Sequence, residues 1–95
     1  MNRFEIIEKM FERLGVQIDG KDIWDIIEDD INSNGKNAGT ASVELGRFGE
    51  DRDLFFAEVK IKQDYDEEDD TWTTDIEILS LQNSKKTIYI EEIKI

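Results

Sequence analysis

The side chains of this chain that could do chemistry are its carboxylates, and they gather in two short stretches. The 95 residues include 24 Asp and Glu against 12 Lys and Arg, with no His, Cys or Pro, for a formal net charge of −12. Residues 19–30 hold six acids and one lysine, a net charge of −5, and residues 64–70 hold six acids and no base, a net charge of −6. These two stretches carry −11 of the charge, so the other 76 residues are nearly neutral. The acidity therefore forms two patches on an ordinary chain.

The first patch falls on a predicted helix. Asp22, Asp25 and Asp29 stand at i, i+3 and i+7, which places them on one helix face, and Glu28 lies beside them. Neighbouring carboxylates in such a row are ~5–6 Å apart and repel one another by a few tenths of a kcal/mol per pair. The positive end of the helix dipole compensates Asp22 and Asp25 but not the later acids. A row kept against this cost can imitate a run of phosphates, which the Arg and Lys side chains of a nucleic-acid-binding protein would recognise.

The second patch is a contiguous run that we expect to form a hairpin loop between two strands. Its candidate partner-binding residues are Asp64, Asp66, Glu67, Glu68, Asp69 and Asp70. Tyr65 and Trp72 lie beside these acids and could add contacts to a partner. One alternative is a solvated loop whose charges keep a sheet edge from aggregating. Another is weak calcium or magnesium binding, although a contiguous run does not supply ligands from separate elements.

Residues 30–35 match the first six positions of an EF-hand calcium loop, Asp-Ile-Asn-Ser-Asn-Gly. The match then fails, because the twelfth position is Ala41 where the loop needs a bidentate Glu, and a strand is predicted to follow in place of a helix. Asn-Ser-Asn-Gly is also typical of a turn that ends a helix. We favour the helix end and predict no metal site and no cofactor.

Composition excludes several further functions. Without Cys or His the chain has no disulfide, no zinc site of the usual kind, no thiol nucleophile and no imidazole base. Two carboxylates can cleave a glycoside, but the acid member needs an apolar pocket to raise its pKa, and these runs are expected to be exposed. Residues 46–49 lack the spacing and lysine of a phosphate-binding loop. We therefore predict that the protein is not an enzyme. A pI near 4.3 also argues against direct binding to nucleic acid or to an anionic membrane.

Two helices are predicted within residues 1–35. The first is capped by Asn2, stops at Gly15, and carries an apolar stripe of Phe4, Ile7, Phe11 and Leu14. The second begins after Asp19 or Asp22 and ends at Asn34-Gly35, with Ile23, Ile26, Ile27 and Ile31 as its apolar positions. Trp24 either packs against the strands or borders the acidic face.

From residue 40 to residue 95 the apolar residues alternate with polar ones, which predicts strands. Four segments show the pattern: 41–45, 55–61, 72–78 and 87–95, with a turn bracketed by Gly46 and Gly49 between the first two. Short connections favour an antiparallel meander with both helices packed on one face, an α+β fold in a single domain of residues 1–95. The isoleucines of 87–95 occur in both phases, so this strand is either buried on two sides or pairs with a second copy, which makes a homodimer one expectation.

No motif identifies a family. In size and charge layout alone, the chain is similar to small acidic inhibitors that phages and mobile elements direct against host nucleic-acid enzymes, such as anti-CRISPR and anti-restriction DNA mimics. The leading hypothesis is therefore an inhibitor that occupies the basic nucleic-acid channel of a nuclease or CRISPR effector. The alternatives are an immunity protein that neutralises a basic toxin nuclease, a divalent-cation-binding module, and an acidic accessory domain.

Residues 1–10 alternate charged and apolar side chains, unlike a signal peptide, and no apolar run approaches the ~20 residues that span a bilayer. We therefore expect a cytoplasmic protein that does not contact a membrane.

Overall fold

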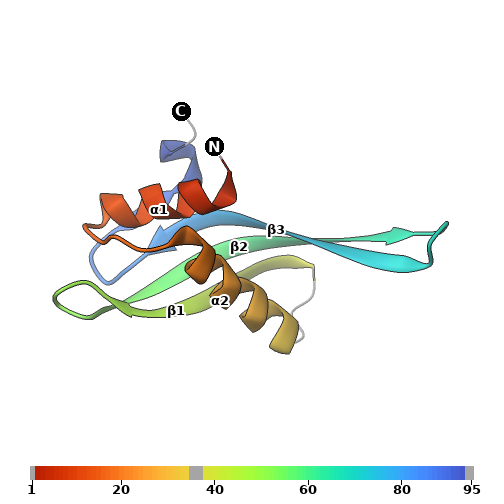
Figure 1. Cartoon of the computed structure of the whole chain (residues 1–95), viewed down its shortest axis with the longest axis horizontal. Helices are drawn as coiled ribbons and strands as arrows, with labels where there is room; N and C mark the ends of the chain where they lie inside the picture. The colour runs from red at the N-terminus through yellow and green to blue at the C-terminus, as the bar shows by residue number, and fades with distance from the viewer. Residues whose placement is uncertain (1, 35–37, 94–95) are drawn as a thin grey trace.

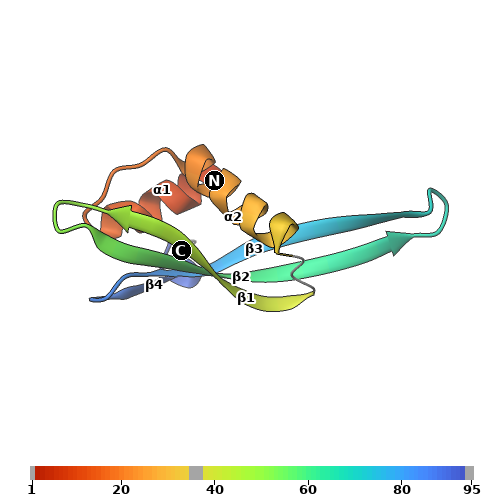
Figure 2. The same cartoon turned by 90° about the horizontal axis from the view of Figure 1, so that it is seen from below.

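A computed structural model describes residues 2–34 and 38–93, in which two helices precede a four-stranded antiparallel sheet. The elements are α1 (Arg3–Arg13), α2 (Gly20–Ser33), β1 (Gly39–Phe48), β2 (Asp53–Asp66), β3 (Thr71–Gln82), β4 (Thr87–Tyr89) and a short 3₁₀ helix, η1 (Ile90–Glu92). The strands lie in the order β1-β2-β3-β4, and both helices cover the same face of the sheet (Figures 1 and 2). The predicted α+β meander is confirmed.

Local capping sets the ends of both helices. The side chain of Asn2 accepts a hydrogen bond from the backbone N–H of Glu5 at 2.9 Å, and α1 is followed by Gly15 at φ +80°, a conformation that favours glycine. α2 begins after Asp19, whose carboxylate accepts from the N–H of Lys21 at 2.9 Å, and it ends at Ser33 with Asn34 as its C-cap. The predicted caps of α1 are confirmed, and of the two candidates for the N-cap of α2, Asp19 and Asp22, the structure has Asp19.

The buried face of α1 is a band broader than the predicted stripe. Ile6, Ile7, Met10 and Phe11 are buried. Phe4 and Leu14, at the two ends of the predicted stripe, are only half-buried against the core. A helix that packs on a sheet buries a wide arc, so neighbours on either side of the line enter the core.

The N-terminus of α2 is held against α1 at Gly20. The backbone N–H of Gly20 donates to the carboxylate of Glu8 at 2.9 Å. A Cβ at this position would lie 2.2 Å from the carbonyl oxygen of Phe4, which no side chain tolerates. The close approach of the two helices therefore depends on glycine, and it fixes the place from which α2 runs across the sheet.

The core lies between the helices and the covered face of the sheet. Phe11 of α1 stacks on Phe55 of β2 with ring centroids 5.0 Å apart, and Phe48 meets both rings edge-on at 5.4 and 5.7 Å. β1 continues through Gly46 to Phe48, so the predicted turn boundary at Gly46 is wrong. The register shifts between Glu44 and Gly46, and this bulge, with Gly46 at φ +119°, lets the strand continue to the turn at 49–52.

The predicted last strand is also too long. β4 ends at Tyr89, and the chain then turns through η1, where the carboxylate of Glu92 accepts from the N–H of Tyr89 at 2.7 Å. The turn changes the phase of the side chains, so that Ile88, Ile90 and Ile93 are all buried. This turn explains why isoleucines occur in both phases of the sequence, so a strand buried on two sides is not needed to explain them. Lys94 and Ile95 lie outside the described residues, and the homodimer remains a prediction.

The β2–β3 hairpin extends well beyond the rest of the sheet. β1 pairs with β2 no further than Ile61, and β4 pairs with β3 only from Ser80 to Gln82. Within the described part of the chain, residues 62–66 and 71–75 therefore pair only with each other, and every residue from 62 to 75 is exposed. We call residues 62–75 the arm; it leaves the body at the end of the long axis (Figure 1). The acidic loop predicted over 64–70 is shorter than expected, because Asp64–Asp66 belong to β2 and only 67–70 form the turn.

Candidate functional site

Three of the four predicted acids of α2 form an exposed row. Asp22, Asp25 and Asp29 are exposed on the side of the helix that faces away from the sheet. Lys21 lies 3.7 Å from the carboxylate of Asp25, as an i, i+4 ion pair in which both side chains are more than half exposed. An ion pair this exposed contributes little energy, and the row as a whole remains strongly negative.

The fourth acid, Glu28, has a different environment. It is half-buried, and its carboxylate accepts a hydrogen bond from the indole N–H of Trp24, one turn earlier on the helix. Trp24 is 3% exposed and belongs to the core, and the guanidinium of Arg3 lies over its ring at 4.9 Å from the ring centre. Trp24 therefore packs inside and does not border the acidic face, while Glu28 serves as the partner of its indole.

A shallow hollow joins the C-terminal half of α2 to the root of the arm. It has a volume of about 270 Å³ and is lined by Arg3, Trp24, Glu28, Asn32, Thr74, Asp75 and Ile76. Side chains alternate along a strand, so Thr74 and Ile76 share the helix-covered face of β3 with Trp72. The same face of β2 carries Ile61 and Tyr65. The aromatic face of the arm is thus continuous with the hollow beside α2.

The tip of the arm is closed by two of its own acids. The carboxylate of Asp66 accepts from the N–H of Glu68 at 3.0 Å, and the hydroxyl of Tyr65 donates to the carboxylate of Asp70. Asp70 itself has φ +52°, a left-handed conformation that Asp tolerates better than most residues. The hydrogen bond to Asp70, with a smaller effect of desolvation, raises the pKa of Tyr65 above its usual value. All six predicted acids of 64–70 are exposed.

Tyr65 and Trp72 form an exposed aromatic pair on the arm. They are direct cross-strand partners, with ring centroids 5.1 Å apart and planes inclined by 46°. Tyr65 is 46% exposed and Trp72 is 68% exposed. The sequence placed both beside the acids but did not show that they meet. Aligning the apolar positions of 61–65 with those of 72–76 as antiparallel strands would have predicted this contact. Both sets of positions lie on the face of the sheet that carries buried isoleucines.

The opposite end of the molecule carries mixed charge. The turns at 49–52 and 83–86 and the end of α1 lie there together (Figure 1), and their basic residues are Arg13, Arg52, Lys85 and Lys86. A pocket of about 380 Å³ between them is lined by four apolar side chains, Leu14, Val16, Phe48 and Phe55, and by four polar ones, Glu50, Asp51, Asn83 and Lys85.

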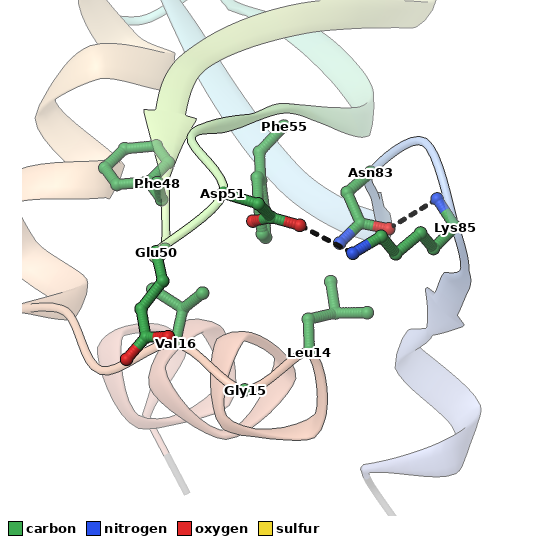
Figure 3. A pocket seen from close by; sticks show the side chains of 10 residues that line it. Leu14, Gly15, Val16, Phe48, Glu50, Asp51, Phe55, Asn83 and Lys85 are labelled. Carbon is green, nitrogen blue, oxygen red and sulfur yellow. Dashed lines mark hydrogen bonds and ion pairs between the residues drawn. The ribbon is translucent and has the colours of Figure 1, made fainter.

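At its rim, Asp51 and Lys85 point toward each other (Figure 3), with 2.5 Å between the ammonium nitrogen and a carboxylate oxygen. This ion pair lowers the pKa of Asp51 and raises that of Lys85. The charges at this end compensate one another, in contrast to those of the arm.

The candidate calcium loop serves as a helix end. The side-chain amide of Asn34 donates to the carbonyl of Asp30 at 2.9 Å and to its carboxylate at 2.7 Å. Gly35, the sixth position of the match, lies outside the described residues. Over residues 2–34 and 38–93, no three acidic side chains come together in a way that could hold a metal ion.

In the part of the chain that the structure describes, no helix is long and apolar enough to cross a bilayer. Comparisons with protein-family models, curated proteins and solved structures found no match to the chain.

Proposed function

We propose that this protein is a DNA-mimic inhibitor of the anti-CRISPR or anti-restriction type, which blocks the basic channel of a nucleic-acid-binding enzyme. The observation that supports the proposal best is the polarised placement of its charge. The acidic arm forms one end of the elongated molecule, α2 with its acidic row crosses the middle, and the end opposite the arm holds compensated charges (Figure 2). A coat that served only solubility would have no reason to be so uneven.

The density of charge on α2 is suited to this role. Asp29 lies seven residues after Asp22, so the row is ~10 Å long along the helix axis at 1.5 Å per residue. One strand of duplex DNA carries a charge every ~3.4 Å along its axis, or about three over the same length. Lys and Arg side chains spaced for phosphates would therefore find carboxylates at a similar density. Attraction of this kind accelerates association and weakens as salt is added.

The test compares two triple variants that change the charge equally. Asp22→Asn, Asp25→Asn and Asp29→Asn neutralise the α2 row, whereas Glu12→Gln, Glu50→Gln and Glu91→Gln neutralise exposed acids elsewhere. Both are assayed for inhibition of DNA binding by a Cas nuclease and by a restriction enzyme over a range of salt concentrations.

We expect the α2 variant to lose at least ~10-fold in potency and to show a weaker salt dependence, with the control within ~2-fold of the unmodified protein. Inhibition that does not respond to salt, or an equal loss in both variants, contradicts the proposal.

One observation favours a second candidate, an immunity protein that neutralises a basic toxin nuclease. The exposed Tyr65–Trp72 pair is the kind of aromatic group that anchors tight protein–protein interfaces. Such an interface excludes water around its anchors, so the complex should persist at high salt. Retention of a toxin nuclease through a high-salt wash supports this candidate, and release at moderate salt supports the DNA mimic.

A further inference from the structure

The aromatic pair of the arm is more exposed than a purely structural role requires. An isolated two-stranded ribbon is marginally stable, and a cross-strand aromatic pair is a usual way to stabilise one. Tyr65 and Trp72 do so, with ring centroids 5.1 Å apart. Nevertheless 68% of the Trp72 surface faces solvent, against 3% for Trp24. Most of the Trp72 ring is therefore free to contact another molecule.

Carboxylates lie beside this aromatic face and behind it. The hydroxyl of Tyr65 is bonded to Asp70, and the alternation of β2 places Asp64 and Asp66 on the opposite face of the same ribbon. Aromatic rings beside regularly placed negative charges are the pattern of a single nucleic-acid strand, whose bases and phosphates are both accessible. A duplex conceals its base faces, and the α2 row, which has no exposed aromatic residue among the described positions 20–33, resembles that arrangement.

We propose that the arm enters a groove that binds single-stranded nucleic acid, with Trp72 and Tyr65 in the positions of stacked bases and the acids of 64–70 in the positions of phosphates. This inference rests on the proposed function and adds the class of target. Proteins that bind single strands combine a positively charged groove with aromatic side chains on which bases stack. The arm complements both features, and its exposed residues 62–75 can enter a groove without interference from the helices.

Charge also excludes a second copy as the occupant. Two arms placed face to face would bring together two runs of six acids, with Lys62 as the only base on each arm. Like charges directly opposite one another destabilise a sheet, so the acidic arm disfavours its own association.

The test uses two labelled nucleic acids of equal length. An oligo(dT) strand is bound to an OB-fold single-strand-binding protein, and a duplex is bound to a restriction enzyme without magnesium. The protein is titrated against each complex at low salt. We expect it to displace oligo(dT) at ~10-fold lower concentration than the duplex, because only the single-strand groove has surfaces for the aromatic pair.

Three variants test the role of Trp72. Trp72→Ala should lose ~10-fold in oligo(dT) displacement, which corresponds to one lost stacking contact, while Trp72→Phe should retain most of it. Tyr89→Ala removes an aromatic side chain that is 56% exposed on β4, away from the arm, and should have no effect. In Trp72→Ala the only remaining tryptophan is the buried Trp24, so its emission reports whether the body is still folded.

The outcomes separate the two proposals. Displacement of the duplex at equal or lower concentration overturns the single-strand inference and leaves the proposed function in place. The same result follows if Trp72→Ala behaves like Tyr89→Ala. Failure to displace either nucleic acid contradicts the proposed function and the inference together.

Discussion

The two acidic surfaces of this protein, the row on α2 and the arm, are held in place by different kinds of contact. α2 buries Ile23, Trp24, Ile27 and Ile31, and its first residue is fixed against α1. Its acids therefore have the rigidity of the core. The arm has no buried residue between 62 and 75, and it depends on backbone pairing, one aromatic pair and two turn-closing carboxylates. The protein thus presents one fixed row of charge and one extended element whose position is set mainly by its own strands.

The two tryptophans provide the largest contrast between these regions. Trp24→Ala should lower the free energy of unfolding by about 3–5 kcal/mol, because it leaves a cavity and an unpaired, half-buried Glu28 carboxylate. Trp72→Ala should cost less than about 1 kcal/mol, because it removes a single exposed cross-strand pair. Urea denaturation followed by circular dichroism measures both. Equal losses would mean that the arm is part of the cooperative core.

Neutralising single acids compares α2 with the arm through smaller changes in the free energy of unfolding. Asp22→Asn, in the first turn of α2, should destabilise by about 0.5 kcal/mol because the helix dipole favours a negative charge there. Asp29→Asn should stabilise by a few tenths of a kcal/mol, since it relieves repulsion from Asp25 one turn earlier. Glu67→Gln on the arm should change stability by less than either. Paired denaturation curves at low salt measure these differences. Shifts of the same sign for Asp22 and Asp29 would contradict this account of α2.

The smallest expected effect is a shift in titration at the tip of the arm. Asp70→Asn should bring the raised pKa of Tyr65 back toward its ordinary value, measured by tyrosinate absorbance in a Tyr89→Phe background so that only Tyr65 titrates. Folding favours the protonated phenol, so the contribution of this hydrogen bond is complete below the ordinary pKa and is lost as the pH rises through the raised one. An unchanged pKa in Asp70→Asn would show that the hydrogen bond does not form in solution.

The sequence was sufficient to predict the fold and the exposure of most of the acidic residues that it singled out. Alternation and helical spacing predicted two helices and a four-stranded meander, and the caps at Asn2, Gly15 and Asn34 were evident. The 3₁₀ turn after Tyr89 was not, because it depends on one local hydrogen bond to Glu92 that alternation does not reveal. The role of Glu28 was also missed, although its position four residues after Trp24 allows the contact.

The extension of the arm past the helices was not predicted from the sequence, and the reason lies in the different lengths of helices and strands. α2 and β2 each have 14 residues, but a helix of that length spans ~21 Å and a strand ~46 Å. The helices therefore cannot cover the whole sheet, and one end of the longest hairpin must extend past them. Alternation alone treats a covered strand and an uncovered one alike, since Tyr65 and Trp72 continue the apolar phase of Ile61 and Ile76. Element lengths, compared with one another, carried the missing information.

The elongated shape adds a consequence for how encounters begin. The molecule measures 49 × 29 × 20 Å, with its negative charge displaced along the longest direction, so it has a permanent electric dipole along that axis. Within about one Debye length of a basic surface, ~8 Å at physiological salt, the field exerts a torque on this dipole. The molecule then turns with the arm foremost before any contact forms, which shortens the rotational search that limits most protein associations.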